Sequence, residues 1–363
     1  MSALAQEYAG INLSQGFPDY EIDGNLKKYL AKATEDGFNQ YAPMTGNPLL
    51  VEGLIRFNQQ RSQPIIFSKS EITMTPGATY GIYTALACVL EPGDEVIILE
   101  PTYDSYQPAV EANSGIAVLV GLTNDFDVDW ALLKSKISPK TKAIIVNTPH
   151  NPTGKIWEKN DWEKLWNLIE NTEIIVVSDE VYDLIVYDSR EFTSALHHPK
   201  ISQRCFSIFS FGKMFHATGW KVGYVVANEE FTASFRHLHQ YLSFSVNAPA
   251  QVALANYLAE FDVKKNIELL QQKRDFFLSK IEDLSFKLQQ PTQGSYFQVL
   301  GFEEISDLSD KDFAIWLTKE VGVATVPMSA FYKDLRNTGK VRFCFTKKEE
   351  TILAAIERLK KLK

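Results

Sequence analysis

The stretches AIIVNTPHNPTG (Ala143–Gly154) and EIIVVSDEVY (Glu173–Tyr182) contain the pattern that decides the fold. In each stretch a short apolar run ends at polar residues, Asn147 in the first and Asp179 in the second. The runs are apolar on both faces, which is typical of a parallel strand covered by helices on each side. The segment between them, Asp161–Asn171, is predicted to be a helix. A strand–helix–strand unit of this kind indicates a parallel sheet with right-handed crossovers.

The same alternation of strands and helices extends over the middle of the chain. The predicted strands are Glu95–Leu99, Ala117–Val120, Ala143–Asn147, Ile174–Ser178, Phe206–Phe209 and Val222–Ala227. A further predicted helix, Thr79–Leu90, follows a tight turn that begins at Thr75. We therefore predict an α/β fold with a large domain over residues 31–256 that contains a mostly parallel sheet.

The pattern changes after about Asn256. A long charged helix near Lys264–Asp283 comes first, and strand-like pieces at Ser295–Val299 and Val341–Cys344 precede a terminal helix at Lys348–Leu362. This order is typical of a small α+β domain. The first thirty residues do not fit the rhythm of the sheet, so we expect residues 1–30 to pack with residues 257–363.

Composition limits the classes of function. The 363 residues carry 37 basic and 45 acidic side chains, a net charge of −8, which argues against a nucleic-acid partner. The cysteines Cys88, Cys205 and Cys344 form no CxxC pair, so neither a disulfide framework nor a zinc site is expected. The N-terminus lacks the features of a signal peptide, and no apolar run could span a membrane. These features predict a soluble, cytoplasmic protein.

Polar residues at the ends of neighbouring predicted strands suggest a site, since open α/β sheets bind ligands there. Asp179 follows an apolar strand directly, and a carboxylate in that position is costly to bury unless it meets a cation. Lys213 follows the apolar FSFG, where burial should lower the pKa of the amine and make it nucleophilic. The turn before Thr79 opens onto a helix whose N-terminus can bind an anion. An acid, a lysine and a phosphate cradle are what a pyridine aldehyde phosphate requires.

These residues belong to a longer set of motifs. In chain order they are INLSQGFPDY, QYAPMTGNPLL, EPTYDSY, NTPHNPTG, SDEVY, SFGKMFHATGWKVGY, FSVNAPAQ and VRFCFTKKEETI. From residue 10 to the end, the sequence resembles the class I, fold type I aminotransferases that depend on pyridoxal 5′-phosphate, and within them the methionine and kynurenine aminotransferases. The resemblance implies a mostly parallel seven-stranded sheet in the large domain. It also implies a ping-pong transfer of the amino group of methionine, and of aromatic amino acids or kynurenine, to a 2-oxo acid.

The resemblance assigns cofactor roles to named residues. Lys213 would hold the cofactor covalently and then move a proton, while Asp179 would pair with the ring nitrogen and keep it protonated. Asn151 and Tyr182 would hydrogen-bond the ring oxygen. The remaining cofactor contacts would be Tyr103 on the ring face, the N–H groups of Ala78 and Thr79 with Ser210 and Lys221 on the phosphate, and Tyr41 reaching that phosphate from the other subunit of a homodimer.

The substrate side is assigned in the same way. Arg342 would bind the substrate carboxylate through its two-pronged guanidinium, helped by the backbone of Gly16 and by Asn151. The candidate walls of the side-chain pocket are Tyr20, Tyr103, Tyr296 and Phe331, and Tyr20 and Phe331 are equally well explained as aromatic residues of the core. Two departures from relatives are visible: Lys221 stands where many class members have arginine, and Met1 aligns near an internal position, so that a short segment covering the active site would be missing.

Several alternatives stay open at this level. The same residues could serve a cysteine-conjugate carbon–sulfur lyase, because the cofactor permits several bonds to break. A cofactor-sensing transcription factor would need an added DNA-binding segment, and a dinucleotide-dependent oxidoreductase would need a GxGxxG run that the sequence lacks. His216 is either a proton relay or a packed residue. His237 and His239 are half of a metal site, and without a third ligand no metal is expected.

Overall fold

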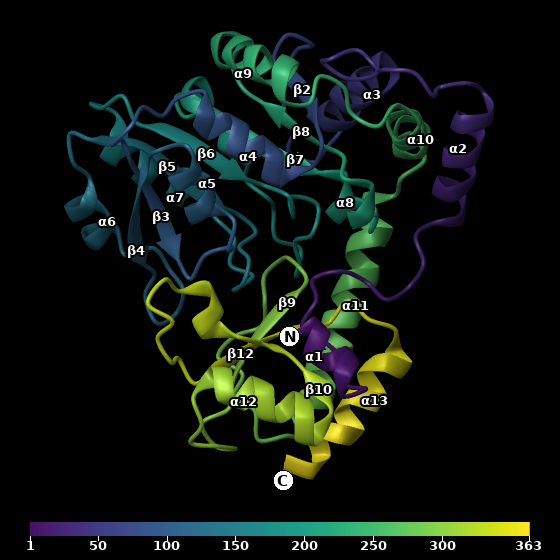
Figure 1. The fold of residues 1–363 in the computed structure, drawn as a ribbon, viewed down its shortest axis with the longest axis vertical. Coiled ribbons are helices and arrows are strands. Elements are labelled where there is room, and N and C mark those ends of the chain that lie inside the picture. Colours follow the sequence, from purple (N-terminus) through teal and green to yellow (C-terminus); the bar gives the residue numbers. More distant parts are fainter. Residues whose placement is uncertain (363) are drawn as a thin grey trace.

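The computed structural model describes residues 1–362 and contains a sheet-based upper part and a smaller lower part (Figure 1). The upper part is built on a seven-stranded sheet in the order β2-β8-β7-β6-β5-β3-β4. Its strands are β2 (Ile72–Thr75), β3 (Glu95–Glu100), β4 (Ile116–Gly121), β5 (Thr141–Asn147), β6 (Ile175–Asp179), β7 (Cys205–Ser210) and β8 (Gly223–Val226). Strand β8 is antiparallel to β2 and β7, and the pairs from β7 to β4 are parallel. The predicted α/β fold is confirmed.

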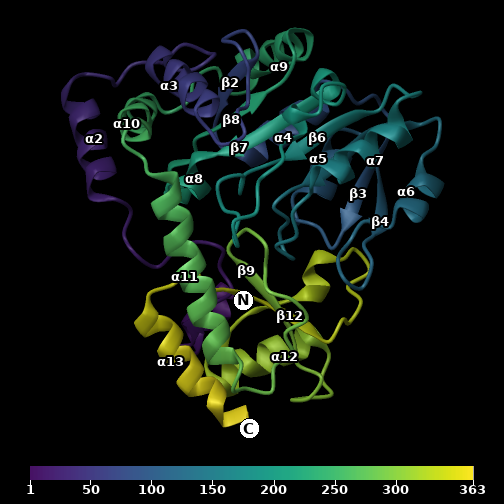
Figure 2. The same ribbon diagram turned by 180° about the vertical axis from the view of Figure 1, so that it is seen from behind.

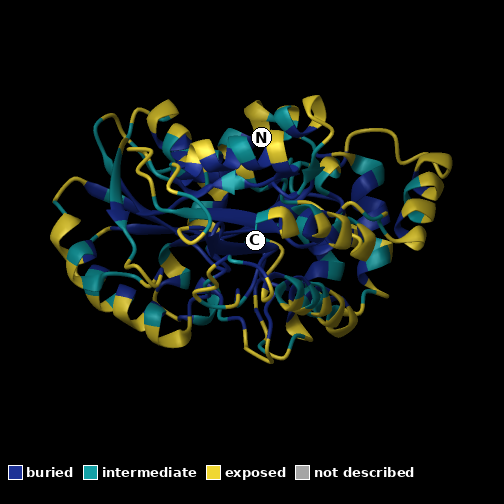
Figure 3. Ribbon diagram, turned by 90° about the horizontal axis from the view of Figure 1, so that it is seen from below, coloured by how far each residue is buried: buried dark blue, intermediate teal, exposed yellow. Residues whose placement is uncertain are grey.

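Helices cover both faces of this sheet, which explains why successive residues in the middle of its strands, such as Ala143–Val146 of β5, are apolar. Ile145 of β5 faces a cluster with α4 (Ala78–Ala87), α5 (Tyr106–Ala112) and α9 (Glu229–Leu242). The adjacent Ile144 faces the opposite cluster, with α6 (Trp130–Lys136) and α7 (Lys159–Ile169). In Figure 3 the buried strands accordingly lie between layers of helices that are exposed on their outer sides.

The lower part contains a three-stranded antiparallel sheet in the order β11-β12-β9. Its elements are β9 (Phe297–Gly301), α12 (Asp310–Trp316), β10 (Val323–Ala324), β11 (Val326–Pro327), β12 (Lys340–Cys344) and α13 (Glu349–Leu359). The long helix α11 (Val263–Ile281) leads into this part from the upper one (Figure 2). The start of the chain joins it too, because β1 (Ile11–Asn12), which follows α1 (Ser2–Glu7), pairs with β10.

The next helix of the chain lies against the upper part. Helix α2 (Gly24–Glu35) places Leu26 in one apolar cluster with Leu54 of α3 (Pro48–Gln59) and Leu254 of α10 (Ala248–Leu258). Figures 1 and 2 both show α2 beside α10. The domain boundaries at residues 31 and 256 stay predictions.

The six predicted strands match β3 to β8 within two residues at each end. Strand β2 was not predicted, because four residues beside a turn carry little pattern and pairing with the distant β8 defines the strand. Within residues 1–362, no helix is both long and apolar enough to cross a membrane.

Candidate active site

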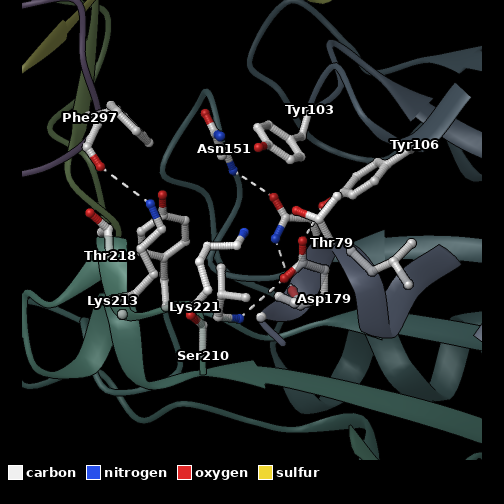
Figure 4. A pocket seen from close by; sticks show the side chains of 18 of the residues that line it. Thr79, Tyr103, Tyr106, Asn151, Asp179, Ser210, Lys213, Thr218, Lys221 and Phe297 are labelled. Atoms are coloured by element: carbon white, nitrogen blue, oxygen red, sulfur yellow. Dashed lines mark hydrogen bonds between the residues drawn. The ribbon is translucent and has the colours of Figure 1, made fainter. Parts of the chain in front are cut away.

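A cavity of about 300 Å³ opens where the carboxyl ends of β5, β6 and β7 meet residues of the lower part. The last residues of the first two strands, Asn147 and Asp179, lie side by side in register. Many of the residues predicted for the site line this cavity: Gly16, Ala78, Thr79, Tyr103, Asn151, Asp179, Tyr182, Ser210, Lys213, Lys221 and Arg342. Segments from both ends of the chain therefore converge on one cavity (Figure 4).

Lys213 lies in the short helix α8 (Phe211–Met214), immediately after β7. Its Nζ donates a hydrogen bond to the carbonyl of Gly16 at 3.3 Å and lies 5.4 Å from the ring centre of Tyr182. Burial lowers the pKa of the Lys213 amine to about 8, because the charged form is poorly solvated there. About a tenth of the amine is therefore uncharged, and nucleophilic, at pH 7, far more than for an exposed lysine.

Asp179 is the acid of the cavity, with only 4% of its surface exposed. One carboxylate oxygen accepts a hydrogen bond from the Tyr106 hydroxyl at 2.5 Å, and the other accepts from the Val181 N–H at 3.3 Å. Burial raises the pKa of Asp179 to about 6, and the two hydrogen bonds and Lys213 oppose that rise. The carboxylate is thus ionised at neutral pH and can pair with a cation such as a protonated pyridine nitrogen.

The N-terminus of α4 forms an anion cradle. Gly77 precedes the helix at a φ of 86°, a left-handed conformation that favours glycine, and no side chain caps the free N–H groups that follow. A Cβ at residue 77 would lie 3.2 Å from the Nζ of Lys221. The lysine ammonium therefore sits beside the helix N-terminus, and Ser210 and Thr218 line the same cavity. Together these groups suit a phosphate.

Arg342 enters the cavity from β12 and is 7% exposed. Its guanidinium donates to Oδ1 of Asn151 at 2.6 Å and to the carbonyl of Ser14 at 3.1 Å. The aromatic rings of Phe297 and Phe331 lie 3.8 and 4.8 Å from its central carbon. The hydrogen bonds to Asn151 and Ser14 use two of the five N–H donors of the guanidinium group, which leaves donors for a carboxylate.

Four predicted residues lie outside the lining of the cavity. Phe331 contacts Arg342 from behind, and the fully buried Tyr296 donates from its hydroxyl to the carbonyl of Lys213. Tyr20 packs edge-on against His216, with ring centres 5.5 Å apart. Tyr41 is 83% exposed on the surface of the chain and touches the Phe244 ring.

The histidines singled out in the sequence have defined surroundings. His216 is hydrogen-bonded through Nδ1 to Tyr296 at 3.1 Å and through Nε2 to Asn266 at 2.9 Å. His239 is buried and lies 2.7 Å from the Tyr80 hydroxyl, whereas His237 packs on Tyr241. Within residues 1–362, no three His, Cys, Asp or Glu side chains are grouped to hold a metal ion.

Several residues that line the cavity had no predicted role, and three of them contact predicted residues. Tyr106 holds Asp179, Phe297 stacks on Arg342, and Asn147 donates to the backbone carbonyl of Asp179 at 2.9 Å. Tyr106 and Asn147 lie in the motifs EPTYDSY and NTPHNPTG, so their position was visible in the sequence and their role was not.

The sequence matches the description "Aminotransferase class I and II" over residues 9–359. The chain belongs to the class I and II aminotransferases. The methionine aminotransferase of Escherichia coli (strain K12) is 42% identical, with 100% of this chain and 94% of that protein covered. Kynurenine–oxoglutarate transaminase 1 of Rattus norvegicus is 32% identical, with 99% of this chain and 94% of that protein covered.

Solved structures of aminotransferases share the fold of this chain. An Escherichia coli protein identified as a methionine aminotransferase superposes with a TM-score of 0.95 at 42% identity, covering 99% of this chain and 96% of that one. The N-succinyldiaminopimelate aminotransferase of Mycobacterium tuberculosis gives a TM-score of 0.94 at 32% identity, covering 100% and 96%. These matches confirm the prediction of a fold type I aminotransferase.

This aminotransferase is an enzyme that depends on pyridoxal 5′-phosphate, and its cavity fits that cofactor. Lys213 would supply an amine for the aldehyde, Asp179 a buried carboxylate for the ring nitrogen, and the N-terminus of α4 with Lys221 a cradle for the phosphate. When bound, the cofactor supplies an aldehyde that joins to amines and a ring that accepts electrons from the substrate.

Proposed function

We propose that this aminotransferase transfers the amino group of methionine, and of other apolar L-amino acids including aromatic ones and kynurenine, to a 2-oxo acid in a ping-pong cycle. The observation that carries the proposal is the set of cations in the cavity. Among the described residues that line it, the cationic side chains are Lys213, Lys221 and Arg342. Each has a task in amino transfer, so the lining provides no further cation for an acidic substrate side chain.

Arg342 is proposed to bind the substrate carboxylate. Its Nη atoms are held by Asn151 and Ser14 at 2.6 and 3.1 Å, while the buried Nε has no partner among the described residues. Phe297 and Phe331 on either side keep the cation in place and exclude water. A carboxylate bound here would accept charge-assisted hydrogen bonds from the guanidinium, whose orientation is already fixed by its other contacts.

The proton transfers are proposed to use Lys213. With its pKa lowered to about 8, the amine can accept a proton from the substrate α-carbon and can release that proton again at a working pH near neutral. Asp179 would keep the proton on the ring nitrogen, and Tyr103, Asn151 and Tyr182, which line the same cavity, would contact the ring.

The names of the relatives also support this substrate class. The proteins at 42% and 32% identity are called a methionine aminotransferase and a kynurenine–oxoglutarate transaminase. An amino acid with a carboxylate side chain would have to leave water without a cation to receive it, which costs several kcal/mol. The carbon–sulfur lyase alternative has no support from the family or from these relatives.

Single-turnover spectra test the proposal. The cofactor-loaded enzyme is mixed with methionine, phenylalanine, kynurenine, aspartate or glutamate, and the conversion of the cofactor to its amine form is followed by absorbance. We expect methionine and phenylalanine to react at least tenfold faster than aspartate. Equal rates for aspartate and methionine would refute the assignment of an apolar pocket.

We further propose a homodimer in which Tyr41 reaches the phosphate of the other subunit. The exposure of Tyr41 in a single chain supports this, because its ring is 83% exposed and outside the cavity lining of its own chain. Further exposed apolar residues lie near it in sequence or contact: Phe38, Tyr241, Leu242 and Phe244. Such a surface suits a two-fold contact.

We also propose a cytoplasmic location, in keeping with the free thiols of all three cysteines.

A further inference from the structure

Tyr106 is a buried residue of the cavity that has no role in the proposed reaction as described above. It opens helix α5, is 2% exposed, and donates its hydroxyl hydrogen to Oδ2 of Asp179 at 2.5 Å. Its ring lies edge-on to that of Tyr103, with centres 5.7 Å apart (Figure 4). The remainder of the ring packs in the apolar cluster under α4 and α5. The polar end of Tyr106 is therefore aimed at one carboxylate.

The two hydrogen bonds that the Asp179 carboxylate accepts differ in length. The Val181 N–H reaches the other carboxylate oxygen at 3.3 Å, which is long, whereas the contact with Tyr106 is as short as such bonds become. The titratable groups that face the carboxyl are Tyr103, Tyr106, Tyr182 and Lys213. Among these, Tyr106 alone is joined to Asp179 by a hydrogen bond in the described part of the chain.

We propose that Tyr106 is a positioning residue for Asp179: its hydroxyl fixes the orientation of the carboxylate and keeps it ionised in a buried place. The proposal rests on the proposed role of Asp179 as the partner of the ring nitrogen. Strand β6 sets the backbone of Asp179, but a carboxylate can still rotate about its side-chain bonds. A short bond from the neighbouring helix α5 removes that freedom.

The sign of the effect on ionisation follows from the surroundings. Burial raises the pKa of Asp179 to about 6, and the hydrogen bond from Tyr106 is the largest influence in the opposite direction. Without the hydroxyl the pKa rises further, so that the neutral carboxyl becomes populated closer to pH 7. A neutral carboxyl cannot keep the ring nitrogen protonated as a counter-ion, and the acidic limb of the pH profile should move upward.

Tyr106→Phe in the holoenzyme tests this, because phenylalanine keeps the ring and removes the hydroxyl alone. We expect the acidic limb of the single-turnover rate with methionine to move up by about one pH unit, the scale of one hydrogen bond to a charged group. The rate should be about fivefold below wild type at pH 6 and should largely recover at pH 8.5. An equal loss at every pH, or an unmoved limb, would overturn the proposal.

A second readout does not depend on turnover. Pyridoxine 5′-phosphate has the ring nitrogen and the phosphate but no aldehyde, so its binding to the apoenzyme does not require Lys213. In Tyr106→Phe its dissociation constant should increase between pH 8.5 and pH 6 by about fivefold more than in wild type. The same dependence on pH in both proteins would count against the proposal.

Two controls separate the explanations. Tyr187→Phe removes another buried hydroxyl, one that donates to the carbonyl of Ser295 at 2.6 Å, and it should leave the acidic limb where it is. In an Asp179→Asn background, Tyr106→Phe should shift nothing further. If Asp179→Asn itself costs less than tenfold, the role proposed for Asp179 fails. If Asp179→Asn lowers the rate by far more than tenfold and Tyr106→Phe leaves the acidic limb of the pH profile unmoved, only the inference about Tyr106 fails.

Discussion

Replacing Arg342 with lysine tests how the enzyme holds the substrate carboxylate. Lysine keeps a positive charge on β12 but loses the planar fork that Asn151 and Ser14 orient and that Phe297 stacks against. Losing one hydrogen bond to a charged group costs about 1.5–3 kcal/mol. At about 1.36 kcal/mol per decade, kcat/KM for methionine should fall about 10- to 150-fold.

The assay compares methionine with 3-(methylthio)propylamine, which has the same side chain and amine but no carboxylate. The rate of cofactor conversion is measured for both compounds in wild type and in Arg342→Lys. The variant should lose the large factor for methionine and less than about threefold for the amine. Arg274→Lys is the matched control, because Arg274 is also buried but pairs with Asp188 and Asp275 outside the cavity.

The comparison can refute the reasoning directly. An equal loss for methionine and for the amine would show that Arg342 shapes the pocket without binding the carboxylate. Thermal melting of both variants reports whether the buried substitutions unfold the chain.

Further outcomes are expected from the same site. Lys213→Ala should abolish turnover and the borohydride-reducible link to the cofactor while leaving the phosphate bound, and a remaining link would point to another lysine. Asp179→Ala should cost about 3–5 kcal/mol, or about two to four decades in rate, and a loss below tenfold would exclude it as the partner of the ring nitrogen. Because the pKa of Lys213 is lowered to about 8, capture of pyridoxal phosphate by the apoenzyme should accelerate from pH 7 to 9 and then level off; continued acceleration to pH 10 would contradict this. Co-expressed Lys213→Ala and Tyr41→Phe chains should recover near half of wild-type activity per dimer if Tyr41 acts across the interface, and only the level of the weakened parent if it acts within its own chain.

The sequence was sufficient for six of the seven strands of the large sheet and for most of the cavity. These six strands could be placed within two residues because a strand covered on both faces is mostly apolar at successive positions, which is a local signal. Asp179 and Lys213 were found by their place at the ends of such runs, where a buried charge is costly enough to need a reason. The order of the motifs then identified the aminotransferase class.

Only the tertiary structure decided which side chains meet. Arg342, Asn151 and Ser14 come from three distant parts of the chain, and their hydrogen bonds depend on how the lower sheet packs under the upper one. No role was predicted for Tyr106, although it lies in the motif EPTYDSY, because the direction of its hydroxyl toward Asp179 depends on how α5 packs on the sheet. The contact of Tyr20, an expected pocket wall, with His216 is likewise visible only in the tertiary structure. Local pattern specifies the elements since it reflects burial residue by residue, whereas contacts between elements depend on distances that no single stretch of sequence contains.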